Sequence, residues 1–182
     1  MYPGGFDQKE TPEFYGSSEP YLPLAARPDV LVFQTEALDE DTEVTGPISV
    51  RLWIKSTAVD TDFTAKLLDI YPPSADYPEG YALNLTDGII RAKFRDSWEE
   101  PQLLEPGVIY PLTILLFPTS NLFVQSHRIR LDISSSNFPR FDVNGNTGEN
   151  PGLSSVKIAA LNSVYHDSKH PSQVVLPMIP LV

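Results

Sequence analysis

The chain has 182 residues, enough for one domain with a continuous core, and its 41% hydrophobic and 20% charged residues exclude an intrinsically disordered protein. Its 18 prolines exclude long helices, because proline interrupts helix interiors and central strands. A net charge of −11 disfavours nucleic-acid and membrane partners, and the absence of cysteine excludes disulfides, thiolate catalysis and cysteine-ligated zinc.

Residues 1–28 show no hydrophobic period and are rich in proline and glycine, at Pro3, Gly4, Gly5, Pro12, Gly16, Pro20, Pro23 and Pro28. We expect residues 1–28 to be an extended lead-in that packs on the domain, with a plain linker as the alternative. Residues 29–182 are expected to form a β-sandwich domain. No signal peptide and no apolar run of about 18 residues is visible, and a cytoplasmic location is favoured.

The first strand signal covers residues 30–33, and the acidic stretch 39–43 follows as a loop. Gly46-Pro47 is expected to separate this loop from the next strand. Residues 48–54 carry the clearest strand pattern, because every second residue is aliphatic and one face is therefore apolar. Residues 63–71 form a second apolar run that ends at a pair of prolines.

Asp87-Gly88 is a hairpin signal, so residues 81–85 and 89–94 are predicted to be its two arms. Residues 108–117 are apolar on both faces, as expected of a strand between two layers. Further strands are predicted at 128–134, 163–165 and 173–176, with a turn-rich loop around Asn144-Gly145 and Thr147-Gly148. Eight or nine short strands without an intervening helix predict an all-β sandwich or barrel.

No nucleophile elbow of the form Gly-x-Ser-x-Gly is present. The nearest stretches are Gly16-Ser17-Ser18 and Gly152-Leu153-Ser154-Ser155, which lack the second glycine, and Ser126-His127 are only neighbours in sequence. We therefore assign no catalytic residue, and the chain alone lacks the apparatus of a serine hydrolase.

Candidate ligand-binding groups each have a plainer structural interpretation. His166 and His170 have a spacing that suits zinc on a helix, but their segment is predicted to be a loop. The acidic residues Glu36, Asp39, Glu40, Asp41, Glu43, Asp60 and Asp62 do not match calcium-loop spacing. Trp53 and Trp98 are interpreted as core or interdomain residues rather than sugar platforms. No metal or cofactor residue is assigned, and no cofactor is expected.

Several ordered motifs between Val30 and the C-terminus resemble one known family. They are Val44-Thr45-Gly46-Pro47, Asp60 to Ile70, Leu85 to Ala92, Pro118-Thr119-Ser120-Asn121, His127 to Leu131, Ser134 to Asp142, Asn146-Thr147-Gly148, and His170-Pro171-Ser172 with Val174 to Pro177. The chain is similar to the C-terminal domain of the X-prolyl dipeptidyl aminopeptidase and cocaine esterase family of serine hydrolases. One departure is Gln125-Ser126, where that family often turns through a glycine.

The resemblance implies a jelly-roll, galactose-binding-like sandwich that packs against an α/β-hydrolase domain carrying the catalytic triad. It implies a non-catalytic domain that stabilises this hydrolase and helps shape its pocket, while the parent cleaves acyl esters, amides or dipeptides. From the residues themselves, Phe138 and Phe141 are interpreted mainly as structural groups that pin the following loop to the sandwich edge, and the functional version is that the loop after Phe138 faces the partner domain. A carbohydrate-binding module and an oligomerisation module are the alternatives.

Overall fold

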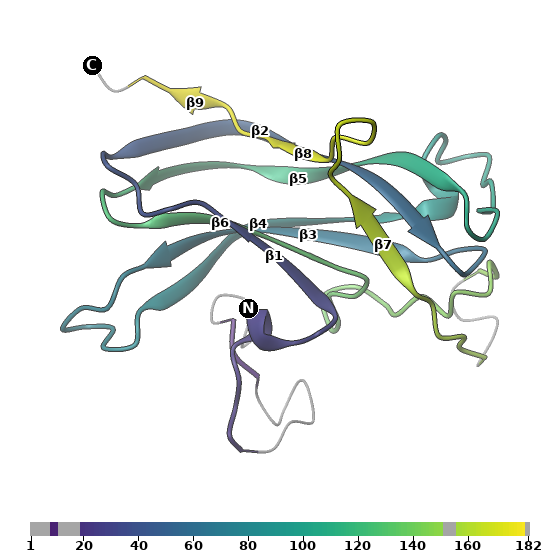
Figure 1. The fold of residues 1–182 in the computed structure, drawn as a ribbon, viewed down its shortest axis with the longest axis horizontal. Helices are drawn as coiled ribbons and strands as arrows, with labels where there is room; N and C mark the ends of the chain where they lie inside the picture. The colour runs from purple at the N-terminus through teal and green to yellow at the C-terminus, as the bar shows by residue number, and fades with distance from the viewer. Residues whose placement is uncertain (1–7, 11–18, 151–155, 181–182) are drawn as a thin grey trace.

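The computed structural model describes residues 8–10, 19–150 and 156–180, and every long element in these ranges is a strand (Figure 1). The described strands are β1 (Val30–Gln34), β2 (Thr42–Ser56), β3 (Asp62–Tyr71), β4 (Tyr81–Arg91), β5 (Ile109–Phe123), β6 (Arg128–Ser134), β7 (Asn162–Tyr165), β8 (Gln173–Val175) and β9 (Met178–Ile179). Two short 3₁₀ turns, η1 (Leu24–Ala26) and η2 (Ala92–Phe94), accompany them. No helix in this part of the chain is long and apolar enough to cross a membrane.

The strands form two antiparallel sheets that lie one above the other in Figure 1. One sheet has the order β1-β6-β3-β4. In the other sheet, β2 pairs with β5 along one side and with β7, β8 and β9 along the other. The predicted all-β sandwich is therefore confirmed, while the jelly-roll subtype stays a prediction.

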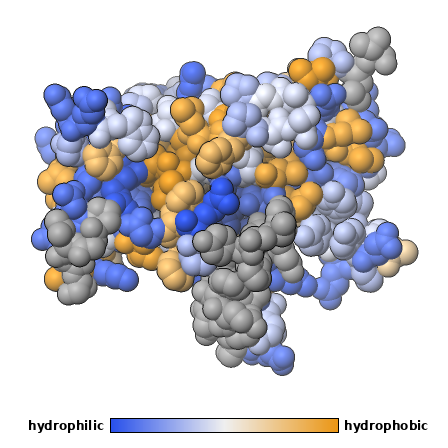
Figure 2. Space-filling model, turned by 180° about the vertical axis from the view of Figure 1, so that it is seen from behind, coloured by the Kyte–Doolittle hydropathy of each residue, from blue (hydrophilic) through white to orange (hydrophobic). Residues whose placement is uncertain are grey.

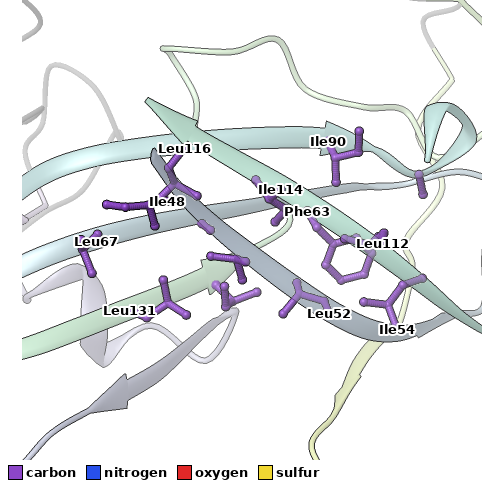
Figure 3. Close-up of a cluster of buried hydrophobic side chains, with 14 of the residues drawn as sticks. Ile48, Leu52, Ile54, Phe63, Leu67, Ile90, Leu112, Ile114, Leu116 and Leu131 are labelled. Carbon is purple, nitrogen blue, oxygen red and sulfur yellow. The ribbon is translucent and has the colours of Figure 1, made fainter. Parts of the chain in front are cut away.

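The core lies between the two sheets and follows the period-two pattern of the strands. In β2, Val50 and Ile54 are completely buried, whereas Arg51 is exposed. Figure 3 shows β2 side chains facing Phe63 of β3 and Leu131 of β6 across the space between the sheets. Burial of each such aliphatic or aromatic side chain stabilises the fold by about 1.5–3 kcal/mol.

β4 runs without a break through Asp87-Gly88, so the predicted hairpin is wrong. Gly88 lies where β4 of one sheet meets β5 of the other, and a Cβ at this position would lie 2.4 Å from the carbonyl oxygen of Leu115. Beside it, Thr86 Oγ1 donates a hydrogen bond to the carbonyl oxygen of Phe117 at 2.7 Å. The glycine therefore allows a close approach of two backbones rather than a turn.

The outer face of β5, an edge strand, is exposed, so the prediction that both of its faces are covered is also wrong. Leu116 is 4% exposed, whereas its neighbours Leu115 and Phe117 are 73% and 63% exposed. Figure 2, which views the molecule from behind, shows hydrophobic residues gathered across the middle of that side. One apolar face of β5 thus packs in the core and the other is open to solvent.

The structure differs from the sequence-based expectations at three further places, and each difference arises from the backbone. β2 continues through Gly46-Pro47 with a shift in register, and Gly46 has a φ of +135°. The strand after Gly88 ends at Arg91, because the next three residues turn as η2. Ser126 adopts a φ of +73°, so the turn before β6 keeps the left-handed geometry that glycine usually supplies.

The described part of the lead-in contacts the sandwich. Gln8 is buried, and its Oε1 accepts a hydrogen bond from Lys66 Nζ at 3.0 Å. Burial lowers the pKa of Lys66. Leu24 of η1 is also buried. The boundary at residue 28 stays a prediction, and the lead-in's first glycines and prolines, at positions 3, 4, 5, 12 and 16, lie outside the described residues.

Candidate docking surface

Two long loops lie at the same end of the sandwich, at the right of Figure 1. Residues 92–108 join β4 to β5, and residues 135–161 join β6 to β7. Lys93 Nζ in the first loop donates to carbonyl oxygens of the second, at 3.0 Å to Gly148 and 3.1 Å to Glu149. The two loops are therefore tied together.

A buried polar network anchors both loops to the sheets. Asp60 Oδ2 lies 4.0 Å from Lys93 Nζ, and both side chains are almost fully buried. Asn144 Nδ2 donates to Asp60 at 3.2 Å and to Asp62 at 2.7 Å. Arg91 forms two parallel hydrogen bonds to Asp62, at 2.9 and 3.0 Å. The buried charges are thus paired, which offsets the cost of removing them from water.

This network changes the pKa values of two of its residues, Asp60 and Arg91. Burial raises the pKa of Asp60, against the opposing hydrogen bonds from Asn144 and the Lys93 backbone. The hydrogen bonds from Arg91 to Asp62 raise the guanidinium pKa above its usual value. Arg91 is therefore always charged, and removal of Asp62 would leave this largely buried cation with only the more distant carboxylate of Asp142, at 3.4 Å.

Asp87 of β4 anchors the segment that follows β6. Asn137 Nδ2 donates to Asp87 at 3.0 Å, and Arg140 Nε lies 3.0 Å from the other carboxylate oxygen. The Arg140 guanidinium also lies 5.9 Å from the ring centroid of Phe117, within cation–π range. Phe138, between these two anchors, is 53% exposed. Polar groups therefore fix this segment while it presents an aromatic ring to solvent.

The apolar side chains of these loops are exposed although their backbones are anchored. Trp98 stacks on Phe94 at a centroid distance of 6.0 Å and is 74% exposed, and Leu161 is 72% exposed. We define the loop surface as the exposed apolar residues of the two loops, namely Trp98, Leu103, Val108, Phe138, Val143, Val156, Ile158 and Leu161. Exposed apolar residues on an anchored backbone are typical of a protein–protein interface.

The serine and histidine candidates lie away from this surface. His127 Nδ1 lies 2.8 Å from Asp69 Oδ1, and its ring packs on Tyr71 at 4.3 Å. Asp69 also accepts a hydrogen bond from Asn121 Nδ2 at 3.3 Å. His127 and its neighbour Ser126 thus belong to the β5–β6 turn and its packing. The stretches at 16–18 and 152–155 lie outside the described residues.

His166 and His170 lie in the connection between β7 and β8, outside any helix. His170 Nδ1 lies 3.2 Å from both carboxylate oxygens of Asp167, and its ring meets Trp53 edge-on at 5.2 Å. The ring of His166 instead meets Phe33 of β1 edge-on at 6.1 Å. The two histidines therefore contact different aromatic side chains.

The acidic stretch before β2 hydrogen-bonds to the protein. Asp41 Oδ1 accepts the backbone N–H of Gln125 at 2.7 Å, and the Asp39 carbonyl oxygen accepts its side-chain amide at 2.9 Å. Glu36 pairs with Arg128 at 3.3 Å. Within the described part of the chain, no three histidine, aspartate or glutamate side chains gather as a metal site requires.

Sequence patterns did not identify the anchors of the loop surface. Lys93 and Asp87 were both assigned to the predicted hairpin, where a strand position gives no sign of a buried charge. The one signal for these anchors was the family resemblance of residues 134–142. This segment contains Asn137 and Arg140, which bind Asp87.

A family model described as the X-Pro dipeptidyl-peptidase C-terminal non-catalytic domain matches residues 6–175. The chain is 44% identical to the cocaine esterase of Rhodococcus sp. (strain MB1 Bresler) over 159 residues, which cover 86% of this chain and 27% of that protein. The chain spans about a quarter of the length of the curated relatives it matches.

Two solved structures share the fold over most of the chain. The first is an aminopeptidase from a marine sediment archaeon of the Thaumarchaeota, with a TM-score of 0.80 and 29% identity over 86% of this chain and 27% of the other. The second is an α-amino acid ester hydrolase, with a TM-score of 0.77 and 31% identity over 86% and 26% of the two chains.

Proposed function

The chain belongs to the family of X-Pro dipeptidyl-peptidase C-terminal non-catalytic domains, and we propose that it stabilises an α/β-hydrolase domain and helps shape its pocket. The hydrolase would cleave an acyl ester, an amide or an N-terminal dipeptide through an acyl-enzyme on its own serine. The present chain supplies structure, and the loop surface is the part that contacts the hydrolase domain.

The observation that carries this proposal is the combination of a fixed base with exposed apolar groups. The two loops are held by ion pairs to the buried carboxylates of Asp60, Asp62 and Asp87. Holding charges inside a protein is costly unless they are paired, so this base resists rearrangement. The side chains of Trp98 and Leu161 nevertheless point to solvent rather than into the core. Such an arrangement suits a preformed interface.

The length of the relatives supports a partner domain. About three quarters of each curated relative lies outside the region that this chain matches. Their names and those of the solved structures describe enzymes that cleave ester or peptide bonds. These comparisons support assigning the chemistry to the part of the parent protein that this chain does not contain.

The proposal is tested with a double substitution, Trp98→Ser with Leu161→Ser, in the full-length protein. Loss of two apolar interface side chains is expected to weaken docking by about 1–4 kcal/mol for each anchor residue. The full-length variant should therefore unfold at a lower temperature and lose ester hydrolysis when the domains separate. The isolated 182-residue chain with the same changes should keep its own unfolding midpoint, because both residues are exposed.

Met178→Ser is the matched control, since Met178 is 59% exposed but lies on β9 away from the loops. An effect of Met178→Ser equal to that of the double substitution would contradict the assignment of the loop surface. Unchanged stability and hydrolysis in the double variant would contradict the proposed role itself.

A further inference from the structure

A surface groove of about 630 Å³ lies between the hairpin that joins β3 to β4, residues 72–80, and the lead-in residues Gln8, Lys9 and Pro23. Figure 1 draws this hairpin at the lower left, where it projects beyond the sheet. β4 runs from the hairpin to the loop before β5, so the groove and the loop surface lie at opposite ends of the sandwich. Among the described residues that line the groove, Gln8 and Arg130 are buried and the others are exposed or half-buried. The volume lies within the roughly 300–1,000 Å³ of small-molecule sites.

Three tyrosines of the hairpin line the groove. Tyr71 ends β3, Tyr81 begins β4, and the two residues pair across the strands. Tyr77, at the hairpin tip, stacks on Tyr81 at a centroid distance of 4.9 Å and meets Tyr71 edge-on at 5.9 Å. Tyr77 is 40% exposed, and the other two rings are half-buried. We call this site the tyrosine groove, and the negative faces of such rings attract cations.

The hairpin holds the tyrosines in place before any ligand binds. The carbonyl oxygen of Tyr77 accepts hydrogen bonds from the backbone N–H groups of Ser74 at 2.8 Å and Gly80 at 2.9 Å. The backbone N–H of Tyr77 donates to Ser74 Oγ at 3.1 Å. Tyr71 packs on His127 at a centroid distance of 4.3 Å. Binding would therefore require little ordering of the groove.

The charged groups that line the groove leave one carboxylate unpaired. Lys9 Nζ lies 3.2 Å from Glu79 Oε2, so these two charges offset each other. Arg130 donates two hydrogen bonds to Asp132, at 2.9 and 2.8 Å. Asp76 is exposed and has no hydrogen-bond or ion-pair partner within the described part of the chain. The groove thus combines aromatic rings with a net negative charge.

We propose that the tyrosine groove binds an organic cation, such as a quaternary ammonium group, with its charge beside Asp76 and its methyl groups against the tyrosine rings. The cations that line the groove are already paired, so a positive ligand meets a complementary charge there. An anion would instead meet Asp76 and the net charge of −11. This site does not depend on the proposed hydrolase partner.

Titration of choline into the 182-residue chain, followed by the aromatic NMR signals of its tyrosines, tests the proposal. Saturable shifts are expected for Tyr71, Tyr77 and Tyr81. Tyr77→Leu should weaken choline binding roughly threefold or more, because it removes a ring face but keeps an apolar side chain. Tyr21→Leu is the matched control, since Tyr21 is 39% exposed and is not among the residues that line the groove.

The neutral alcohol 3,3-dimethylbutan-1-ol separates charge from shape, because it has a carbon atom where choline has its charged nitrogen. Choline should bind roughly fivefold more tightly than this alcohol. Asp76→Asn should reduce that preference, whereas Asp39→Asn, at an exposed aspartate outside the groove, should leave it unchanged.

Equal or tighter binding of the neutral alcohol would overturn the assignment of a cation. Absence of saturable choline binding, or shifts confined to tyrosines outside the groove, would overturn the site. The comparison of the two ligands on the native chain decides the question even if a substituted hairpin fails to fold.

Discussion

At Gly88 the absence of a side chain lets β4 approach β5 until the two backbones touch. A Cβ there would lie 2.4 Å from the Leu115 carbonyl oxygen and 3.1 Å from Ile114 Cγ2. The neighbouring Asp87 is buried and holds Asn137 and Arg140. Two adjacent residues of β4 thus perform different tasks, one closing the sandwich edge and the other anchoring a loop.

Gly88→Ala is expected to destabilise the chain by about 1–3 kcal/mol or more, because the added methyl must displace the backbone of β5. Urea denaturation of the isolated chain measures this change. Gly107→Ala serves as the control, since nothing lies within 4 Å of its new methyl and only its φ of +89° opposes the substitution. An unchanged midpoint for Gly88→Ala would show that the edge is not closed at this position.

Sequence alone could not distinguish these roles. Asp-Gly is a strong hairpin signal because both residues tolerate left-handed geometry, and the pattern contains no information on a second sheet passing nearby. Ser126 illustrates the reverse case. Its φ of +73° lies at the position where the resemblance implies a turn through glycine, so the resemblance placed the turn although the residue type did not.

The loop between β6 and β7 owes its conformation to groups outside itself. Lys93 supplies two hydrogen bonds to its carbonyl oxygens, and Asn144 within the loop reaches Asp60 and Asp62 below it. These contacts join β3, β4 and the loop into one unit. The loop surface is therefore fixed before any partner binds.

Lys93→Met is expected to cost about 3–5 kcal/mol, because it leaves the buried Asp60 without its cation and the loop carbonyls without a donor. Denaturation and amide exchange of residues 144–150 measure the two consequences. Lys157→Met, an exposed lysine in the same loop, should change neither quantity by more than a few tenths of a kcal/mol. Native-like exchange of the loop in Lys93→Met would contradict the anchoring role.

At the scale of elements, the strands with clear alternation were predicted well. β2 and β6 occur where period-two patterns placed them, because one face of each strand packs in the core. β5 was misjudged because an apolar outer face has the same sequence pattern whether a second layer covers it or it is open to solvent. The long loops gave no periodic signal, so their anchors and exposed side chains could not be inferred.

The whole molecule presents three unlike regions around one core. One edge is sealed by β4 and β5, one end carries the loop surface, and the opposite end carries the tyrosine groove. The sequence predicted the sandwich and the family, and the residues around Phe138 suggested a loop that faces a partner domain as the functional alternative to a structural role. The locations of the loop surface and of the tyrosine groove depend on side chains that meet only after folding.

The most direct test compares amide hydrogen exchange in the 182-residue chain alone with exchange of the same residues in the full-length protein. The docking proposal predicts added protection in residues 96–104, 137–149 and 156–161, with little change in β8 and β9. Protection confined to β2, β8 and β9, or no added protection anywhere, would contradict the assignment of the loop surface as the contact with the hydrolase domain.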